Sequence, residues 1–271
     1  MGSAVDLITL GSATPYPRPG RPCSGYLLAH QDTRVWLDAG TGTLAALQAH
    51  TAVDRLAAIW ISHLHADHCA DLLTAFYALR YADLAPAAPI PLYGPAGLAD
   101  RLAHFLSNSG RSPIEEAFEV HELRDGHVAK IGGLRLVTHA VAHGMPAFGV
   151  RVDDGRHSMA FSGDSGPCPG LDRLASGVDL LLCEADSADS ADAAAGEPAV
   201  HLTPEQAGQL ATRAGAGRLV LTHVGPFLTP AQAVARAGAH YAGPIHHAAP
   251  GSRFPVGAGS TGTGECPERP D

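Results

Sequence analysis

The stretch SHLHADH, residues 62–68, places three histidines and one aspartate within seven residues. It directly follows the apolar run LAAIWI, residues 56–61, which predicts a buried strand. Successive side chains of an extended segment point to opposite faces, so His63 and His65 project from the same face. Two imidazoles on one face, just beyond a strand, can bind the same metal ion. The stretch therefore predicts half of a metal site.

The second part of the stretch indicates a further ion. Asp67 and His68 fall at a turn into a helix that we expect to begin near Cys69, where they can face a second metal. The plain alternative is that these histidines make ordinary hydrogen bonds at a strand end. That alternative suits a single histidine better than the dense His-x-His-x-Asp-His pattern, whose residue types are those that zinc prefers.

Patterns of hydrophobicity around the stretch predict alternating strands and helices. Short apolar runs predict strands in the first half over residues 5–12, 25–30, 34–40, 56–62 and 89–95. Helical spacing of apolar residues predicts helices over 41–50, 69–82 and 97–108. The second half is again rich in strands, predicted over 118–123, 127–143, 148–164, 178–186 and 218–225, with a helix over 203–215. The chain therefore has two halves of similar design.

One domain accounts for most of the chain. With 271 residues and 45% hydrophobic content, the chain can bury one sizeable core, and we expect a single α/β domain over residues 1–250. Residues 251–271 are rich in Gly, Ser and Pro and contain few core-forming residues. We expect a disordered tail there, because such a segment cannot bury enough apolar surface to fold.

Composition and charge exclude several classes of function. The formal net charge is −9, from 18 basic and 27 acidic side chains, so a long nucleic acid is not the expected partner. No apolar stretch approaches the roughly 20 residues needed to cross a bilayer, so we expect no membrane span. The five cysteines are scattered without close pairs and the first residues lack a secretion pattern, which together favour the reducing cytoplasm.

Three later motifs complete the pattern that SHLHADH begins. They are AVAHGMPAFG with His143, FSGDSG with Asp164 and LVLTHVGP with His223. With these motifs the chain resembles the metallo-β-lactamase superfamily over roughly residues 5–250. The resemblance implies an α/β fold of the four-layered αββα sandwich type, in which two mixed β-sheets are flanked by helices and a dinuclear metal site lies at one edge.

The resemblance also implies the ligands of the two ions. The family's positions are filled by one bridging carboxylate, Asp164, and by two sets of three residues: His63, His65 and His143 for one ion, and Asp67, His68 and His223 for the other. Asp38 in VWLDAGTG matches an early Asp-x-Gly element and would orient ligands rather than bind metal. Each later residue has an ordinary explanation when taken singly, as a surface, turn or strand-end residue, and the order of all seven is what indicates a site.

Two divalent ions define the expected chemistry. Ions about 3.5 to 4 Å apart share a water, lower its pKa towards neutrality and stabilise charge that develops on a substrate oxygen. A bridging hydroxide is therefore the expected nucleophile. The mixed nitrogen and oxygen ligands favour two Zn²⁺ ions, with Mn²⁺ or Fe²⁺ as alternatives. We expect a small-molecule substrate, and a homodimer is the habit of the family.

Finer motifs favour one branch of the superfamily. The commonest zinc β-lactamases carry Cys at the position of Asp164, and thioesterases of the glyoxalase II kind and acyl-homoserine lactonases carry His-x-Pro-Gly-His where this chain has AHGMPAFG. The opening LGSATPYPRPGRPCSGYLL, residues 10–28, instead resembles ribonuclease Z and related phosphodiesterases. The later segments LLCEADSAD and HLTPEQAG resemble the same branch.

In that branch a Glu and a His lie beside the metals, and Glu184 and His201 match these positions. By this resemblance, His201 donates a proton to the leaving oxygen while Glu184 holds its ring, and Asp67 is counted with them as catalytic as well as a ligand. The alternative is structural, because Thr203 and Pro204 indicate a helix start next to His201. Glu184 could likewise bind backbone groups at a strand end.

The spacing of the motifs bears on the substrate. Bacterial ribonuclease Z carries a tRNA-binding arm between the residues that correspond to His143 and Asp164, which here lie 21 positions apart, too few for the arm. We therefore expect a phosphodiesterase for a small phosphodiester such as a cyclic nucleotide, similar to the actinobacterial cyclic-nucleotide phosphodiesterases. Lactone or thioester hydrolysis on the same site is the alternative. Processing of tRNA 3′ ends and metal binding without turnover are weaker alternatives.

The sequence leaves the roles of several residues open. Residues 69–112 are expected to cover the site, although the apolar residues of LTAFYALRYA suit a core better than a substrate lining. Arg18 and Arg21 could meet a phosphate or lie in a solvated loop. The remaining histidines are expected on the surface or in strands, with His246 and His247 the least secure because the last strand of this fold can pass near the metals.

Overall fold

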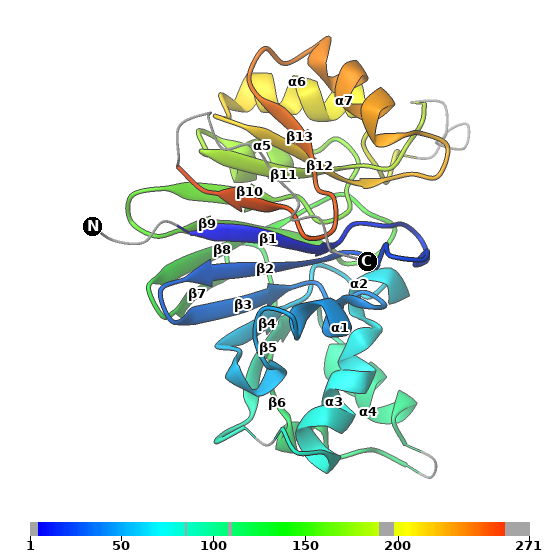
Figure 1. Ribbon diagram of the computed structural model, residues 1–271, viewed down its shortest axis with the longest axis vertical. Coiled ribbons are helices and arrows are strands. Elements are labelled where there is room, and N and C mark those ends of the chain that lie inside the picture. Colours follow the sequence, from blue (N-terminus) through cyan, green and yellow to red (C-terminus); the bar gives the residue numbers. More distant parts are fainter. Residues whose placement is uncertain (1–4, 85, 108–109, 190–197, 258–271) are drawn as a thin grey trace, which may run out of the picture.

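Two seven-stranded β-sheets form the centre of the structure, a computed structural model that describes residues 5–84, 86–107, 110–189 and 198–257 (Figure 1). The first sheet contains, in spatial order, β14 (Arg253–Pro255), β1 (Asp6–Gly11), β2 (Gly25–His30), β3 (Thr33–Leu37), β4 (Ala58–Trp60), β5 (Ile90–Gly94) and β6 (Phe118–Glu122). The second contains β13 (Ile245–His247), β12 (Leu219–Val224), β11 (Leu180–Ala185), β10 (Ser158–Phe161), β9 (Phe148–Asp153), β8 (Leu134–Ala140) and β7 (Val128–Ile131). Both sheets are mixed, because antiparallel pairs such as β1 with β2 and β9 with β10 adjoin the parallel pairs β3 with β4 and β10 with β11.

Helices cover the outer face of each sheet (Figure 1). The first sheet is covered by α1 (Thr43–Leu47), α3 (Asp71–Tyr81) and α4 (Leu98–Phe105), with the short 3-10 helices η1 (Val53–Arg55) and η2 (Ile114–Glu116). The second is covered by α5 (Pro169–Ala175), α6 (Pro204–Ala214) and α7 (Pro230–Gly238). The expected four-layered αββα sandwich is confirmed. Within the described residues, every helix is too short or too polar to span a bilayer.

The strands are apolar on both faces because each sheet packs against a sheet on one side and helices on the other. In β3, Val35 and Leu37 point into the core between the sheets, whereas Trp36 points into the core under the helices. β1 shows the same alternation, with Leu7 towards the second sheet and Ile8 towards the helices. Burying each such side chain contributes roughly 1.5–3 kcal/mol, so the alternation fixes the register of the strands.

Capping residues set where the longer helices of the second half begin. Thr203 and Thr229 each accept a hydrogen bond from the backbone three residues on, and the Gln at that position reaches back to the cap. A proline follows each threonine at the first helical position. The helix predicted over 203–215 is confirmed by α6. The sequence patterns did not reveal α5 or α7.

Two expectations are corrected by the structure. The disordered tail predicted over 251–271 is wrong for residues 253–255, which form β14 and pair with β1, and Phe254 is buried there. Residues 258–271 lie outside the described residues. The helix expected to begin near Cys69 is preceded by another, because α2 (Ala66–Cys69) already contains Asp67 and His68. These two side chains therefore sit on a helical turn rather than before one.

Of residues 69–112, those that the structure describes do not line the cavity beside the cluster, contrary to expectation. Leu72, Phe76 and Leu79 of α3 pack under the first sheet, as the core interpretation predicts. The segment instead contacts the backbone of the loop that contains His63 and His65. The guanidinium of Arg101 on α4 donates to the carbonyl of Leu64, at a distance of 2.6 Å.

Candidate metal centre

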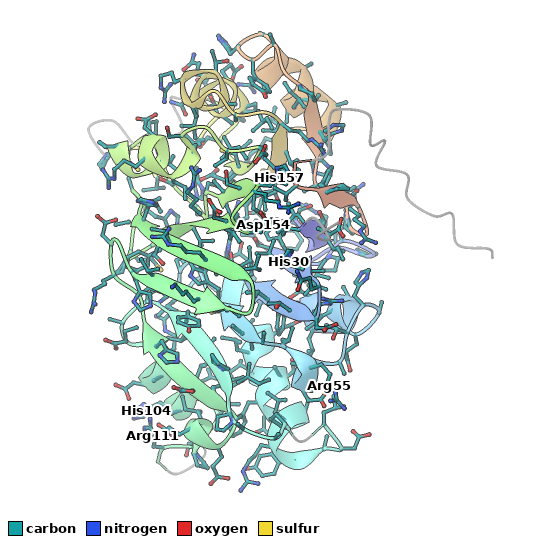
Figure 2. All side chains as sticks on the ribbon, turned by 90° about the vertical axis from the view of Figure 1, so that its left-hand side faces the viewer. His30, Arg55, His104, Arg111, Asp154 and His157 are labelled. Carbon is teal, nitrogen blue, oxygen red and sulfur yellow. The ribbon has the colours of Figure 1, made fainter. Side chains whose placement is uncertain are left out.

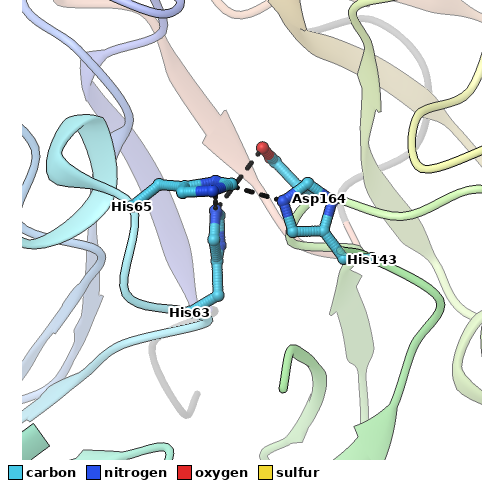
Figure 3. A group of neighbouring side chains, drawn as sticks. All are labelled: His63, His65, His143 and Asp164. Atoms are coloured by element: carbon cyan, nitrogen blue, oxygen red, sulfur yellow. Dashed lines mark hydrogen bonds and ion pairs between the residues drawn. The ribbon is translucent and has the colours of Figure 1, made fainter. Parts of the chain in front are cut away.

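Four side chains from three separate loops converge on one point (Figure 3). His63 and His65 follow β4, His143 follows β8, and Asp164 follows β10. Nε2 of His63 lies 3.0 Å from Nδ1 of His65, which in turn lies 3.1 Å from Nε2 of His143. Oδ2 of Asp164 lies 3.7 Å from Nε2 of His63. One candidate ligand atom from each of the four lies within 4.8 Å of all the others, so the group could hold a metal ion.

Asp67, His68 and His223 form an adjoining group of the same kind. The Nε2 atoms of His68 and His223 are 3.0 Å apart, and Oδ2 of Asp67 lies 3.3 Å from Nε2 of His223. Asp164 reaches this group too, with Oδ1 3.4 Å from His68 and Oδ2 3.5 Å from His223. The structure thus brings together all seven residues expected from the motifs, with Asp164 between the two groups.

The spacing of the ring nitrogens suits ligands around a shared ion. In a tetrahedral site with metal–nitrogen distances of about 2.0–2.1 Å, neighbouring nitrogens lie about 3.3 Å apart. Nδ1 of His68 lies 2.7 Å from the carboxylate of Asp38, so the neutral ring carries its proton on Nδ1 and its lone pair on Nε2. That lone pair points at Nε2 of His223. Nitrogens arranged in this way suit a cation between them, so the donor set fits a divalent metal.

The electrostatics of the two groups differ. Burial lowers the pKa of His63 well below its usual range, and His68 and His143 lower it further, so its ring stays neutral as a metal ligand must. Burial alone would also lower the pKa of His68 and of His223, but Asp164 together with Asp38 raises the pKa of His68, and Asp164 together with Asp67 and Asp186 raises that of His223. The buried carboxylates therefore require positive charge beside them, which either protons or metal ions can supply.

Asp38 binds both ends of the stretch 62–68, which contains four of the candidate ligands. It is fully buried, and its carboxylate accepts hydrogen bonds from the backbone and side chain of Ser62 and from His68. Asp38 and His223 adopt the left-handed backbone conformation, at φ 55° and 48°, which costs free energy in a residue that is not glycine. Gly163 supplies the same conformation, at φ 59°, to the turn that presents Asp164.

His201 and Glu184 form a pair at the edge of the cluster. Nδ1 of His201 lies 3.0 Å from Oε1 of Glu184, which also accepts from the backbone of Ser165, while Oε2 accepts from the backbone of Asp186. Burial lowers the pKa of His201, but the hydrogen bond and charge of Glu184, with Asp164 and Asp186, raise it to about 9. The ring is therefore protonated at neutral pH. The rings of His201 and His223 are stacked, with centroids 6.0 Å apart.

The cluster opens into a cavity of about 460 Å³. The cavity is lined by six polar side chains of the cluster region, His65, Asp67, Asp164, Asp186, His201 and His223, and by Thr14, Pro15, Ala66, Pro226 and Phe227. Sequence reasoning missed Asp186 and Phe227. Asp186 lies two positions after Glu184, and Oδ1 of Asp186 faces Nδ1 of His223 at 3.8 Å with neither atom hydrogen-bonded. Asp186 directly follows β11, and this place at a strand end could have identified it, whereas no periodic signal marks Phe227.

The residues left open by the sequence lie outside this cluster. His247 lines a neighbouring cavity of about 520 Å³ together with Arg18 and Arg21, and His246 packs against Phe254. His30, Asp154 and His157 lie near one another (Figure 2). Among the described residues, none of these three belongs to a group with metal-ligand spacing.

A comparison with known protein families identifies the family to which the chain belongs. The family described as "Beta-lactamase superfamily domain" matches residues 33–224, more than half of the chain. The chain therefore belongs to this superfamily, and its two-sheet fold and His/Asp clusters are those of a metallo-β-lactamase superfamily hydrolase. The resemblance inferred from the motifs is confirmed.

Individual relatives agree with this assignment. "Uncharacterized protein Rv1339" of Mycobacterium tuberculosis (strain ATCC 25618 / H37Rv) is 37% identical over 247 residues, which cover 90% of this chain and 89% of the relative. A "Ribonuclease Z" of Mycolicibacterium gilvum (strain PYR-GCK) is 29% identical over 252 residues, which cover 84% and 87%. The crystal structure of the metallo-beta-lactamase fold protein YhfI from Bacillus subtilis superposes with a TM-score of 0.80 at 23% identity, covering 92% of this chain and 99% of that one.

Proposed function

We propose that this protein is a dinuclear metal-dependent phosphodiesterase that hydrolyses a small phosphodiester such as a cyclic nucleotide. The observation that carries the proposal is the position of His201, which lines the cavity beside the seven-residue cluster with Nδ1 held 3.0 Å from Oε1 of Glu184. A phosphodiester loses an alkoxide, which needs a proton donor at neutral pH. The similarity to a ribonuclease Z supports phosphodiester chemistry for this branch of the superfamily.

The proposed ligands divide between two ions. One ion would be held by His63, His65 and His143, the other by Asp67, His68 and His223, and both by Asp164. Zn²⁺ suits these ligands best, with Mn²⁺ or Fe²⁺ as alternatives. When bound, the two ions lower the pKa of a shared water and neutralise charge on the phosphoryl oxygens.

His201 is the proposed general acid. Nδ1–H of its ring donates to Glu184, which leaves Nε2–H on the side of the cavity, 3.9 Å from Oδ2 of Asp186. The Nε2 proton would pass to the leaving oxygen, and the charge of Glu184 would stabilise the imidazolium before transfer. Asp67 would act through its carboxylate as a ligand at the same cavity.

Two features favour a small substrate over tRNA. The cavity, at about 460 Å³, is in the usual range for sites that enclose small ligands. The interval between His143 and Asp164, where ribonuclease Z carries its arm, is occupied by the hairpin of β9 and β10. Its strands belong to the second sheet, so the interval contains no long insertion.

The test compares classes of substrate on one preparation. Metal-loaded protein is given bis(p-nitrophenyl) phosphate, a p-nitrophenyl ester, a thioester and a lactone, with and without chelator, and then a panel of cyclic nucleotides. His223→Ala is the loss-of-function variant, and His240→Ala is the matched control, because His240 is exposed and outside the cluster. We expect chelator-sensitive phosphodiester cleavage that His223→Ala abolishes and His240→Ala retains.

Other outcomes would overturn the proposal. Cleavage of the acyl substrates alone would assign the site to a lactone or thioester hydrolase. Stoichiometric metal binding without hydrolysis of any substrate would indicate a metal-binding protein without turnover.

A further inference from the structure

Phe227 is the most exposed of the large hydrophobic side chains in the described part of the chain, with 85% of its surface accessible to solvent. It lies on the lining of the cavity that contains Asp67, Asp164 and His201. A single exposed apolar side chain is common on a protein surface, but one that lines the cavity beside the candidate metal centre is available to bind a ligand. The position of Phe227 therefore suits contact with an apolar part of the substrate.

Two prolines extend this apolar surface. Pro226 precedes Phe227 directly, and Pro15 comes from the loop after β1, and both line the same cavity. The carboxylates and imidazoles of the candidate metal centre supply the rest of the lining. The cavity thus combines a polar part suited to a phosphate with bound metals and an apolar part, which we call the apolar wall, formed by Pro15, Pro226 and Phe227.

The segment that carries Phe227 is held on both sides. The backbone N–H of Leu228 donates to the carbonyl of Gly225, at 3.2 Å, and Thr229 then caps α7. Gly225 packs so closely on Asp186 that an added Cβ would lie 2.1 Å from its carbonyl oxygen. The turn from His223 to α7 is therefore fixed, and the exposure of Phe227 is a property of that turn.

We propose that Phe227, with the apolar wall, stacks on the base of the substrate, so that the substrate is a nucleotide phosphodiester rather than a sugar phosphodiester without a base. This inference rests on the proposed phosphodiesterase function and deepens it. Aromatic side chains stack on every base, because every base has a π face. Phe227 is then a specificity-determining residue that selects nucleotides as a class and does not distinguish strongly between bases.

The first test measures selectivity for the base. Kinetics are measured on cyclic AMP and on the same ribose cyclic phosphate without a base, for wild type, Phe227→Ala and Phe227→Tyr. Phe105→Ala is the matched control, because Phe105 on α4 is 73% exposed and does not line the cavity. We expect Phe227→Ala to lower the preference for cyclic AMP about tenfold or more, through KM, and Phe227→Tyr to restore it.

The second test detects stacking without turnover. The two native tryptophans, Trp36 and Trp60, are buried in the cores, so Phe227→Trp adds an exposed indole whose fluorescence reports on the cavity. Adenosine 5′-monophosphate, which has a base but no phosphodiester bond, is titrated into the metal-loaded full-length variant. We expect saturable quenching with Phe227→Trp and none with Phe105→Trp.

The two tests separate this inference from the proposed function. Hydrolysis of cyclic AMP with an unchanged base preference in Phe227→Ala, and no quenching in Phe227→Trp, would overturn the stacking role and leave the phosphodiesterase in place. Quenching by the nucleotide with no hydrolysis of any phosphodiester would support the nucleotide site and overturn the phosphodiesterase. Loss of preference together with saturable quenching would establish both.

Discussion

Nδ1 of His68 lies 2.7 Å from Oδ2 of Asp38, and both side chains are buried. This contact fixes the ring proton of His68 on Nδ1 and directs its Nε2 lone pair into the cluster. The same carboxylate accepts from the backbone and hydroxyl of Ser62, so one buried residue orients both the loop and the ring. We therefore expect metal binding to depend on Asp38, although Asp38 is outside the proposed ligand set.

Replacing Asp38 tests that dependence. We expect Asp38→Asn to weaken metal affinity by roughly 10- to 100-fold, because an amide no longer supports the basicity of His68. Competition with a chromogenic chelator measures the affinity. Asp32→Asn, which removes an exposed carboxylate from the turn between β2 and β3, is the control and should leave affinity unchanged. Equal affinities for Asp38→Asn and wild type would contradict the orienting role.

The pKa of His201 predicts how activity depends on pH. Glu184 is the main group that raises this pKa to about 9, against the opposing effect of burial. The acid form of His201 is therefore present below about pH 9 and is lost as the pH rises through that value. We expect kcat to fall on the alkaline side near pH 9 in wild type, and Glu184→Gln to move that fall to lower pH.

A matched variant controls for loss of charge in the pH experiment. Asp186 contributes less than Glu184 to the raised pKa of His201, so Asp186→Asn should move the alkaline fall by a smaller amount. The pH profiles of kcat for the three proteins provide the measurement. An alkaline limb that stays in place in Glu184→Gln would exclude His201 as the group that titrates.

Metal binding should compete with protons. Against the lowering effect of burial, Asp164 with Asp38 raises the pKa of His68 and Asp164 with Asp67 raises that of His223, and an ion bound to either ring must displace its proton. As the pH falls below those raised values, we expect the apparent Zn²⁺ affinity to fall by about tenfold per pH unit for each displaced proton. Titrations of metal-free protein at several pH values measure this slope. Affinity that does not change with pH would mean that these rings are not ligands.

A glycine couples two parts of the site. A Cβ on Gly166 would lie 1.8 Å from the carbonyl oxygen of Ala199, in the segment whose next residue, Val200, accepts a hydrogen bond from Nδ1 of His143. His201 follows directly. Gly166→Ala should therefore displace both histidines, and a shift of about 1 Å can cost about 100-fold in rate.

The control for Gly166→Ala lies in the same region. A Cβ on Gly144 would meet no atom within 4 Å, and its backbone is not left-handed, so Gly144→Ala should retain activity. Steady-state kcat/KM and thermal unfolding of the two variants provide the comparison. A fully active Gly166→Ala protein would show that the segment can move without disturbing the site.

Local patterns were enough to predict the first four residues of the ligand cluster and most strands, whereas His143, Asp164 and His223 were found through the resemblance to a known family. The first part could be predicted because four of the residues share the stretch 62–68, whereas the other three lie 75 or more positions further along the chain. The strands could be predicted because they are buried on both faces, and their apolar runs are continuous. The metal-ligand pattern of residues 62–68 and each apolar run of a strand are contained in a few neighbouring residues.

Features that depend on distant contacts could not be predicted. β14 has only three residues and forms by pairing with β1, nearly 250 positions earlier in the chain. α5 and α7, of seven and nine residues, were also not predicted, although Thr229 and Pro230 mark the start of α7 as Thr203 and Pro204 mark that of α6. Phe227 joins the cavity only because the turn after β12 comes close to the loop that contains Pro15. The expectation that residues 69–112 cover the site was wrong because the packing of α3 and α4 under the first sheet also depends on contacts between distant parts of the chain.

The most direct test of the central claim is a metal titration followed by turnover. Protein stripped of metal by chelation is supplied with Zn²⁺ or Mn²⁺ in steps, and hydrolysis of a cyclic nucleotide is measured at each step beside elemental analysis of bound metal. A dinuclear phosphodiesterase predicts no turnover without metal and a maximum at about two ions per chain. Full turnover by the stripped protein, or none at any metal content, would contradict the account.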